Sequence, residues 1–144
     1  MGRILSIDYG AKRVGIAVTD PLKMIANGLT TVETKDIFSF LKEYLGKEPV
    51  ECFVVGEPKR LNGEATDSSK MVIDFVEKLK KEFPQVPVNM IDERFTSKMA
   101  FQAMIDGGLK KKDRQDKAMV DKVSATIILQ SYLENIAFQK NSQI

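Results

Sequence analysis

The sequence of 144 residues contains no histidine and a single cysteine. Because no imidazole is available as a general base or a metal ligand, Ser-His-Asp catalysis, Cys-His catalysis and histidine-based zinc sites are excluded. Acid-base chemistry must therefore use carboxylates, lysine, tyrosine or metal-bound water. The lone thiol, Cys52, can form neither an internal disulfide nor a multi-thiolate metal site, so nothing in the sequence requires an oxidising compartment.

Long hydrophobic runs are also missing from the sequence. The apolar runs all fall short of the roughly 18 residues that a membrane span needs, and the opening MGRILSID becomes charged too early for a secretory signal. We therefore expect a cytoplasmic protein that does not associate with a membrane. A hydrophobic fraction of 43% with 29% charged residues is typical of a globular chain. We expect a single domain over residues 1–138 and a frayed tail over 139–144.

Hydrophobic periodicity divides the chain into two halves. Alternation predicts strands over 3–8, 14–19 and 26–33 with short connections, which favours an antiparallel meander. Gly15 and Ala17 alternate with large apolar residues in the second strand, and they leave room for another segment to approach closely. After residue 33 the spacing predicts four helices, over 37–45, 67–83, 97–105 and 118–137. Strands over 50–56 and 86–92 separate the first three of them. Asp36 is placed to cap the first of these helices and Gly46 to end it.

This order of elements predicts an α/β fold. Strands that alternate with helices pair in parallel through right-handed crossovers, whereas the opening meander is antiparallel. We therefore expect a five-stranded mixed sheet flanked by helices.

Three acids occupy positions that solubility alone does not explain. Asp8 ends the first predicted strand, Glu93 ends the last one together with Asp92, and Asp121 lies in the first turns of the final helix. If the fold brings these carboxylates together, a cation must neutralise their mutual repulsion. Oxygen ligands suit Mg²⁺ or Mn²⁺, and two such ions about 4 Å apart would activate water for phosphodiester hydrolysis without histidine.

Each acid also has a simpler interpretation. Asp8 could cap the following turn, Glu93 could pair with a neighbouring base, and Asp121 could be a helix-start acid favoured by the macrodipole. Their joint occurrence is the stronger argument for a site.

Basic residues are concentrated late in the chain. Between Arg94 and Lys122 there are eight basic residues and four acids, so this stretch carries +4 while the rest of the chain sums to −2. The centre of the stretch, KKKDR over 110–114, follows two glycines and predicts a flexible loop able to meet phosphates. The alternative is a solvated charged loop.

Several motifs together resemble one family. They are IDYGAKRVGIA over 7–17, VVGEP over 54–58 followed by Asn62-Gly63, DERFTS over 92–97, and DK at 121–122 leading to IILQSYL over 127–133. Nearly the whole chain, from Arg3 to Leu133, resembles the YqgF family. Its members are described as bacterial pre-16S rRNA nucleases and as Holliday-junction-resolvase-like proteins with an RNase H-like fold.

The resemblance implies a metal-dependent nuclease that matures the 5′ end of 16S rRNA. It implies Asp8, Glu93 and Asp121 as catalytic acids that hold Mg²⁺ or Mn²⁺, with Asp92 as a weaker candidate. The partner is then a nucleic acid, RNA rather than DNA, and ribosomal precursor particles are a further expected partner. Lys12, Arg13 and Arg94 lie within the matched motifs and suit substrate phosphates. The basic loop adds Lys110, Lys111, Lys112 and Arg114 to these expected substrate-binding residues.

One residue departs from the family pattern. The position after Gly56 is usually apolar or aromatic in the family, whereas here it is Glu57. Glu57 could be an extra metal ligand or a residue at the rim of the site, and we leave it out of the catalytic set.

Three other functions remain open at the level of sequence. A non-catalytic RNA-binding maturation factor would use the same fold for docking, and a resolvase of four-way DNA junctions would use the same acids. A nucleotide phosphotransferase is least favoured, because a chain of 144 residues lacks the second lobe that closes over nucleotide.

Overall fold

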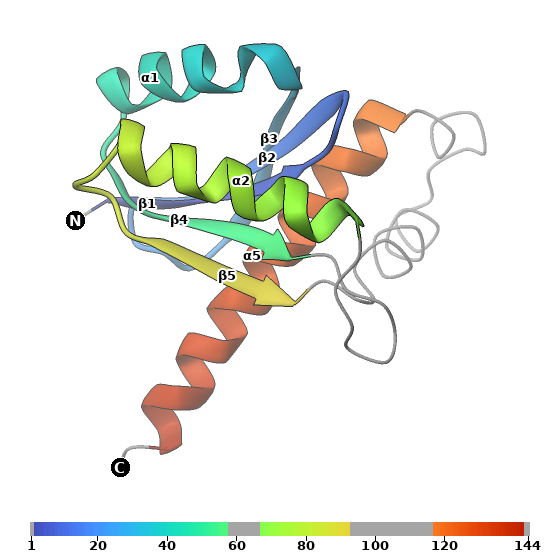
Figure 1. Cartoon of the computed structure of the whole chain (residues 1–144). Helices are drawn as coiled ribbons and strands as arrows, with labels where there is room; N and C mark the ends of the chain where they lie inside the picture. Colours follow the sequence, from blue (N-terminus) through green and yellow to red (C-terminus); the bar gives the residue numbers. More distant parts are fainter. Residues whose placement is uncertain (1, 58–66, 93–116, 143–144) are drawn as a thin grey trace.

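The computed structural model describes residues 2–57, 67–92 and 117–142 (Figure 1). The helix expected over 97–105 lies outside these ranges. In the described ranges the helices are too short or too polar to cross a bilayer. The elements are β1 (Arg3–Tyr9), β2 (Arg13–Thr19), β3 (Ala26–Glu33), a 3-10 turn (Thr34–Asp36), α1 (Ile37–Lys47), β4 (Val50–Glu57), α2 (Asp67–Glu82), β5 (Val88–Asp92) and α5 (Lys117–Ser142).

The five strands form one mixed sheet in the order β3-β2-β1-β4-β5. β1 pairs antiparallel with β2, and β2 pairs antiparallel with β3, as a meander requires. β4 pairs in parallel with β1 on one side and with β5 on the other. The expected five-stranded sheet, antiparallel and then parallel, is therefore confirmed.

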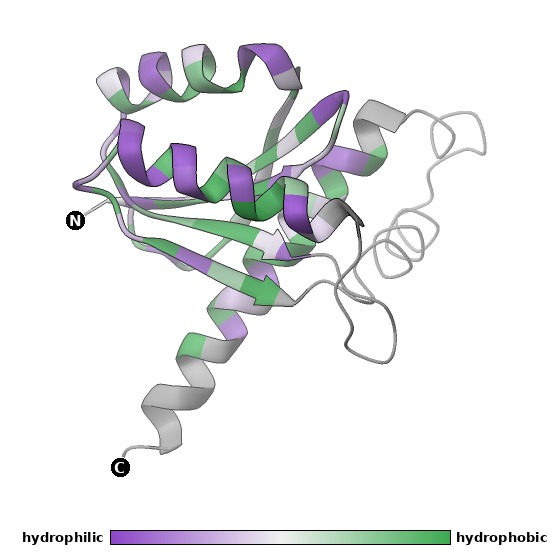
Figure 2. Ribbon diagram, viewed as in Figure 1, coloured by the Kyte–Doolittle hydropathy of each residue, from purple (hydrophilic) through white to green (hydrophobic). Residues whose placement is uncertain are grey.

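Helices cover both faces of the sheet. Figure 1 shows α1 and α2 on one face and α5 on the other. Alternation in β1 explains the two layers, because Leu5 and Ile7 belong to the core beneath α1 and α2 whereas Ile4 packs with residues of α5. In Figure 2 hydrophobic residues follow the central strands, while hydrophilic and hydrophobic residues alternate along α1 and α2.

The start of α1 differs from the sequence prediction. Asp36 makes no side-chain capping hydrogen bond, so the predicted cap is wrong. A 3-10 turn precedes the helix instead, and the backbone N–H of Ile37 donates to the carbonyl of Thr34. Asp36 itself has φ −102° and ψ 1°, which is not the extended conformation from which a capping side chain reaches the N–H groups of the first turn.

The end of α1 also differs by a residue or two. The helix continues through Gly46 to Lys47, so Gly46 does not terminate it. Glu48 turns the chain into an extended conformation, and its N–H donates to the carbonyl of Tyr44 at 2.9 Å. Because Pro49 disfavours a helical conformation at the residue before it, the proline rather than the glycine ends the helix.

The last helix is longer than its apolar pattern predicts. α5 runs to Ser142, beyond the expected end near residue 137. Its central residues Ala125, Ile128 and Leu129 are buried against the sheet. The domain limit at residue 138 stays a prediction.

Candidate active site

Asp8 and Asp92 lie at the carboxyl edge of the sheet. β1, β4 and β5 are parallel, so their carboxyl ends meet at this edge, and the β1–β2 hairpin turns there as well. Ligands of open α/β sheets bind in the crevice outside the carboxyl ends of the strands. Asp8 is the penultimate residue of β1, and Asp92 is the last residue of β5.

Gly15 sets the distance between β2 and α5. A Cβ atom built on Gly15 would overlap the backbone carbonyl of Asp121, so only glycine allows the helix to lie this close to the strand. The close approach expected at Gly15 is therefore made by α5. One turn further along, Ser6 Oγ donates a 2.6 Å hydrogen bond to the carbonyl of Ala125 and fixes the same helix on β1.

The same contact brings two of the expected acids to one face of the sheet. Asp8 is the cross-strand partner of Gly15, and directly opposed residues of an antiparallel pair share a face. Asp121 lies on that face above Gly15. Asp8 and Asp121 therefore flank one glycine, although a long stretch of sequence separates them.

Asp121 already has a cationic partner within the chain. Arg13 Nε lies 2.9 Å from Asp121 Oδ2, and the two side chains are 35% and 25% exposed. Arg13 comes from the first position of β2, on the same face as Gly15 by alternation. The contact uses Nε, which leaves the Nη groups available for a substrate phosphate.

The hairpin that carries Lys12 is tied to the start of the 3-10 turn. The Thr34 N–H donates to the carbonyl of Lys12 at 3.0 Å, and Thr34 Oγ1 donates to the carbonyl of Gly10 at 2.6 Å. These two bonds hold the tip of the hairpin, and the exposed side chain of Lys12 extends from it. The structure thus places Arg13 against Asp121, and Lys12 at the tip of the adjoining hairpin.

Tyr9 belongs to the opposite face of the sheet. Its ring stacks on Phe75 of α2 with centroids 4.2 Å apart. Burial raises the pKa of the Tyr9 phenol, so the hydroxyl stays protonated at neutral pH. Tyr9 is therefore a packing residue rather than a general base.

Glu57 lies on the other side of the sheet from Asp8. In β4 it lies on the same face as Phe53 and Val55, which belong to the core beneath α1 and α2. Its ladder partner is Asp92. The structure therefore does not group Glu57 with Asp8 and Asp121, in agreement with its omission from the catalytic set.

The remaining expected site residues lie outside the described ranges. They are Glu93, Arg94, Lys110, Lys111, Lys112 and Arg114. Within the described ranges no group of three or more cysteine or acidic side chains is placed to hold a metal ion.

The donor set nevertheless fits a hard divalent ion. Asp8 is half-buried, and Asp121 is partly exposed at the same edge of the sheet. Mg²⁺ is commonly held by one or two carboxylates together with waters and substrate phosphate oxygens. Cys52 does not contribute a soft ligand, because it is buried and burial raises the pKa of its thiol.

Known proteins are similar to this chain over almost its full length. Residues 2–135 match the family model RuvX, described as Holliday junction resolvase. A relative from Phocaeicola vulgatus is 58% identical over 135 residues, which cover 94% of this chain and 97% of the relative. One from Bacteroides thetaiotaomicron is 56% identical over 96% of this chain and its own full length. Both carry the name "Putative pre-16S rRNA nuclease".

A solved structure shares the architecture. T. thermophilus RuvC in complex with Holliday junction substrate superimposes with a TM-score of 0.56 at 18% identity, covering 94% of this chain and 96% of the RuvC chain. This likeness confirms the RNase H-like fold. The chain belongs to the RuvX family, and the resemblance found in the sequence motifs is thereby confirmed.

Proposed function

We propose that the protein is a divalent-metal-dependent nuclease that hydrolyses phosphodiester bonds in the 5′ leader of precursor 16S rRNA. The observation that carries the proposal is the placement of Asp8 and Asp121 around Gly15 at the carboxyl edge of the sheet. The names of the relatives support RNA as the substrate. Ribosomal precursor particles are the proposed partner, and a cytoplasmic location agrees with that role.

Asp8 and Asp121, with Glu93, would hold one or two Mg²⁺ or Mn²⁺ ions. Such ions supply an activated water and stabilise the leaving oxygen. Arg13 neutralises Asp121 through Nε and offers its remaining N–H groups to a phosphate oxygen. Lys12 adds a second cation from the hairpin tip, which would orient the scissile phosphate against the carboxylates. Arg94 and the loop 110–114 are proposed as further phosphate contacts.

A DNA substrate is the second candidate. The description of the family as Holliday junction resolvase favours it, since a four-way junction would be cut by the same carboxylates. A direct comparison in one assay separates the two substrates.

The test is cleavage of labelled precursor 16S leader RNA and of a labelled four-way DNA junction, with Mg²⁺, Mn²⁺ or chelator. We expect faster cleavage of the RNA, and we expect Asp8→Asn and Asp121→Asn to slow it by about 100-fold or more. Glu77→Gln is the matched control, because Glu77 is an exposed acid of α2 on the opposite face of the sheet.

Three outcomes would contradict this proposal. Faster cutting of the junction would favour the resolvase. Binding without cleavage that survives chelator and both amide variants would favour a non-catalytic binding factor. Cleavage by Asp8→Asn at the rate of the parent would remove the assigned role of that carboxylate.

A further inference from the structure

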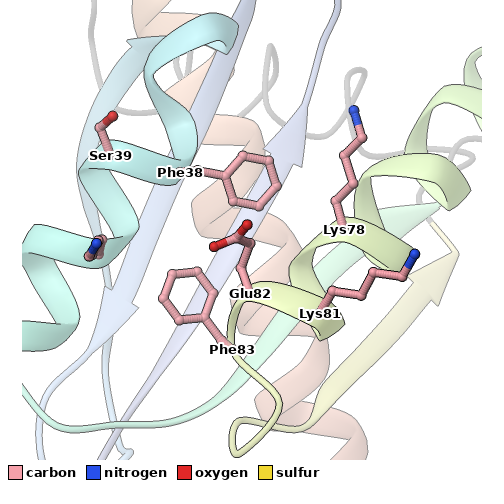
Figure 3. A pocket seen from close by; sticks show the side chains of 7 residues that line it. Phe38, Ser39, Lys78, Lys81, Glu82 and Phe83 are labelled. Atoms are coloured by element: carbon pink, nitrogen blue, oxygen red, sulfur yellow. The ribbon is translucent and has the colours of Figure 1, made fainter.

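A second feature lies on the opposite face from Asp121, between α1 and α2. A cavity of about 590 Å³ separates the two helices, and its lining includes Phe38, Lys42, Lys78, Lys81 and Phe83, which we call the α1–α2 groove. Figure 3 shows Phe38 and Phe83 pointing into the space between the helices, with Lys78 and Lys81 extending from α2. A volume in the range of about 300–1,000 Å³ is typical of ligand sites.

The lysines of the groove are available for a ligand. Lys42, Lys78 and Lys81 are all exposed, and within the described residues none of them forms an ion pair. Among the described residues, Glu82 is the one acid that lines the same cavity. The groove therefore keeps an excess of positive charge, which favours an anionic ligand.

Two further cavities lie between the groove and the β1–β2 hairpin. The next, of about 570 Å³, shares Phe38 and Lys78 with the groove and reaches Tyr9 and Lys35. The third, of about 510 Å³, shares Lys35 with the second and ends at Lys12 and Arg13. The three cavities therefore adjoin one another in a row from the groove to the β1–β2 hairpin.

Charge along this row of cavities is predominantly positive. The cations lining the three cavities are Lys12, Arg13, Lys35, Lys42, Lys78 and Lys81, and the acids are Glu33, Asp74 and Glu82. Lys35 and Glu33 form an ion pair at 3.2 Å, but both side chains are more than half exposed, so the pair is weak and open to exchange for a phosphate.

We propose that the α1–α2 groove binds a single-stranded segment of the RNA that extends from the cleavage site over the β1–β2 hairpin. A cationic groove with aromatic side chains is the usual surface for single-stranded nucleic acid, because phosphates meet the lysines while bases stack on the rings. The half-buried rings of Phe38 and Phe83 lie among the lysines at this position. This proposal rests on the proposed nucleic-acid substrate.

RNA binding is measured in the presence of a chelator, which removes divalent ions and thereby prevents cleavage of the probe. The probe is the precursor 16S leader RNA with a single-stranded extension, compared with a blunt duplex of the same stem. The test variant is Lys42→Ala with Lys78→Ala. The matched control is Lys47→Ala with Lys80→Ala, which also removes one exposed lysine from α1 and one from α2, but outside the groove.

We expect the test variant to lose affinity for the extended RNA and the control to keep that of the parent. For the test variant, the slope of the logarithm of the RNA-binding constant against the logarithm of the salt concentration should fall in magnitude by about 1.4. Two lysines are removed, and each single-strand phosphate contact contributes about 0.7. Lys42→Arg with Lys78→Arg should restore the slope, because it keeps both charges. The blunt duplex should bind all variants equally.

Each contrary outcome has a distinct meaning. Equal affinity and equal salt slope for the test variant and the control variant would overturn RNA binding by the groove, while leaving the nuclease proposal intact. An equal loss on the blunt duplex would overturn the single-stranded assignment. Absence of any RNA binding by the parent would overturn the groove and the proposed substrate together.

Discussion

Arg13 and Asp121 meet at 2.9 Å although 108 residues separate them in the sequence. The pair is partly exposed, so it adds little to stability, typically about 0–1 kcal/mol. Its importance lies in the electrostatics of the site. The guanidinium and a divalent ion are both attracted to the same carboxylate, and they repel each other. Arg13 is therefore expected to weaken metal binding while it strengthens substrate binding.

Substitution of Arg13 by Gln should separate these two effects. We expect Mn²⁺ to bind the variant about two- to fivefold more tightly, the equivalent of about 0.5–1 kcal/mol, because a competing cation is gone. Cleavage of leader RNA should become slower, since a phosphate contact is lost. Titration calorimetry without RNA measures the first effect, and a cleavage assay measures the second.

Arg3→Gln is the control for this pair. Arg3 forms a comparable ion pair with Glu48 at 3.4 Å, but it lies at the start of β1, away from the carboxyl edge. We expect this variant to match the parent in both assays. Weaker Mn²⁺ binding by Arg13→Gln than by the parent would contradict the assigned competition.

At the scale of elements, the contact between β2 and α5 determines whether the site forms. Gly15 allows the backbone of α5 to rest on β2, and Gly28 of β3 leaves room for the side chains of Lys122 and Thr126. The position of α5 on the sheet thus depends on two glycines, one in β2 and one in β3, that have no side chain. Small displacements of α5 would move Asp121 relative to Asp8.

Gly15→Ala should therefore impair both folding and activity. The added methyl group meets backbone atoms that cannot rotate away, so we expect a loss of about 1–3 kcal/mol in the free energy of unfolding and slower cleavage. Urea unfolding followed by far-UV circular dichroism measures the loss, since the chain has no tryptophan.

Gly46→Ala is the matched control. Gly46 lies in α1 with open space around it, so alanine should stabilise the protein by about 0.5–1 kcal/mol through its higher helix propensity. Unfolding of Gly15→Ala at the same urea concentration as the parent would refute the close contact.

The elements differ in how well the sequence predicts them. The sequence predicts the strand over 26–33 with the bounds found for β3, because turn residues precede it and the helical period follows it. The sequence does not predict how α1 begins, because the preceding 3-10 turn leaves Asp36 outside the extended conformation that a capping residue adopts. The Arg13–Asp121 pair lies beyond sequence patterns, since the position of α5 on the sheet depends on tertiary contacts at Gly15 and Ser6.

For the whole molecule, hydrophobic periodicity predicts the sheet but not the groove between the helices that cover it. Alternating strands and helices determine the mixed sheet through handedness and the burial of both its faces. Lys42 and Lys78, by contrast, are ordinary surface lysines in the sequence. They become part of one groove only through the relative rotation of α1 and α2, which packing decides.

The central claim about the molecule is that the fold brings Asp8 and Asp121 together on one divalent ion. The most direct measurement is Mn²⁺ binding by titration calorimetry to the parent, Asp8→Asn, Asp121→Asn and the double variant. We expect each single change to cost nearly as much affinity as both together, because the two carboxylates act on one ion. Unchanged binding in Asp8→Asn, or losses that simply add, would contradict it.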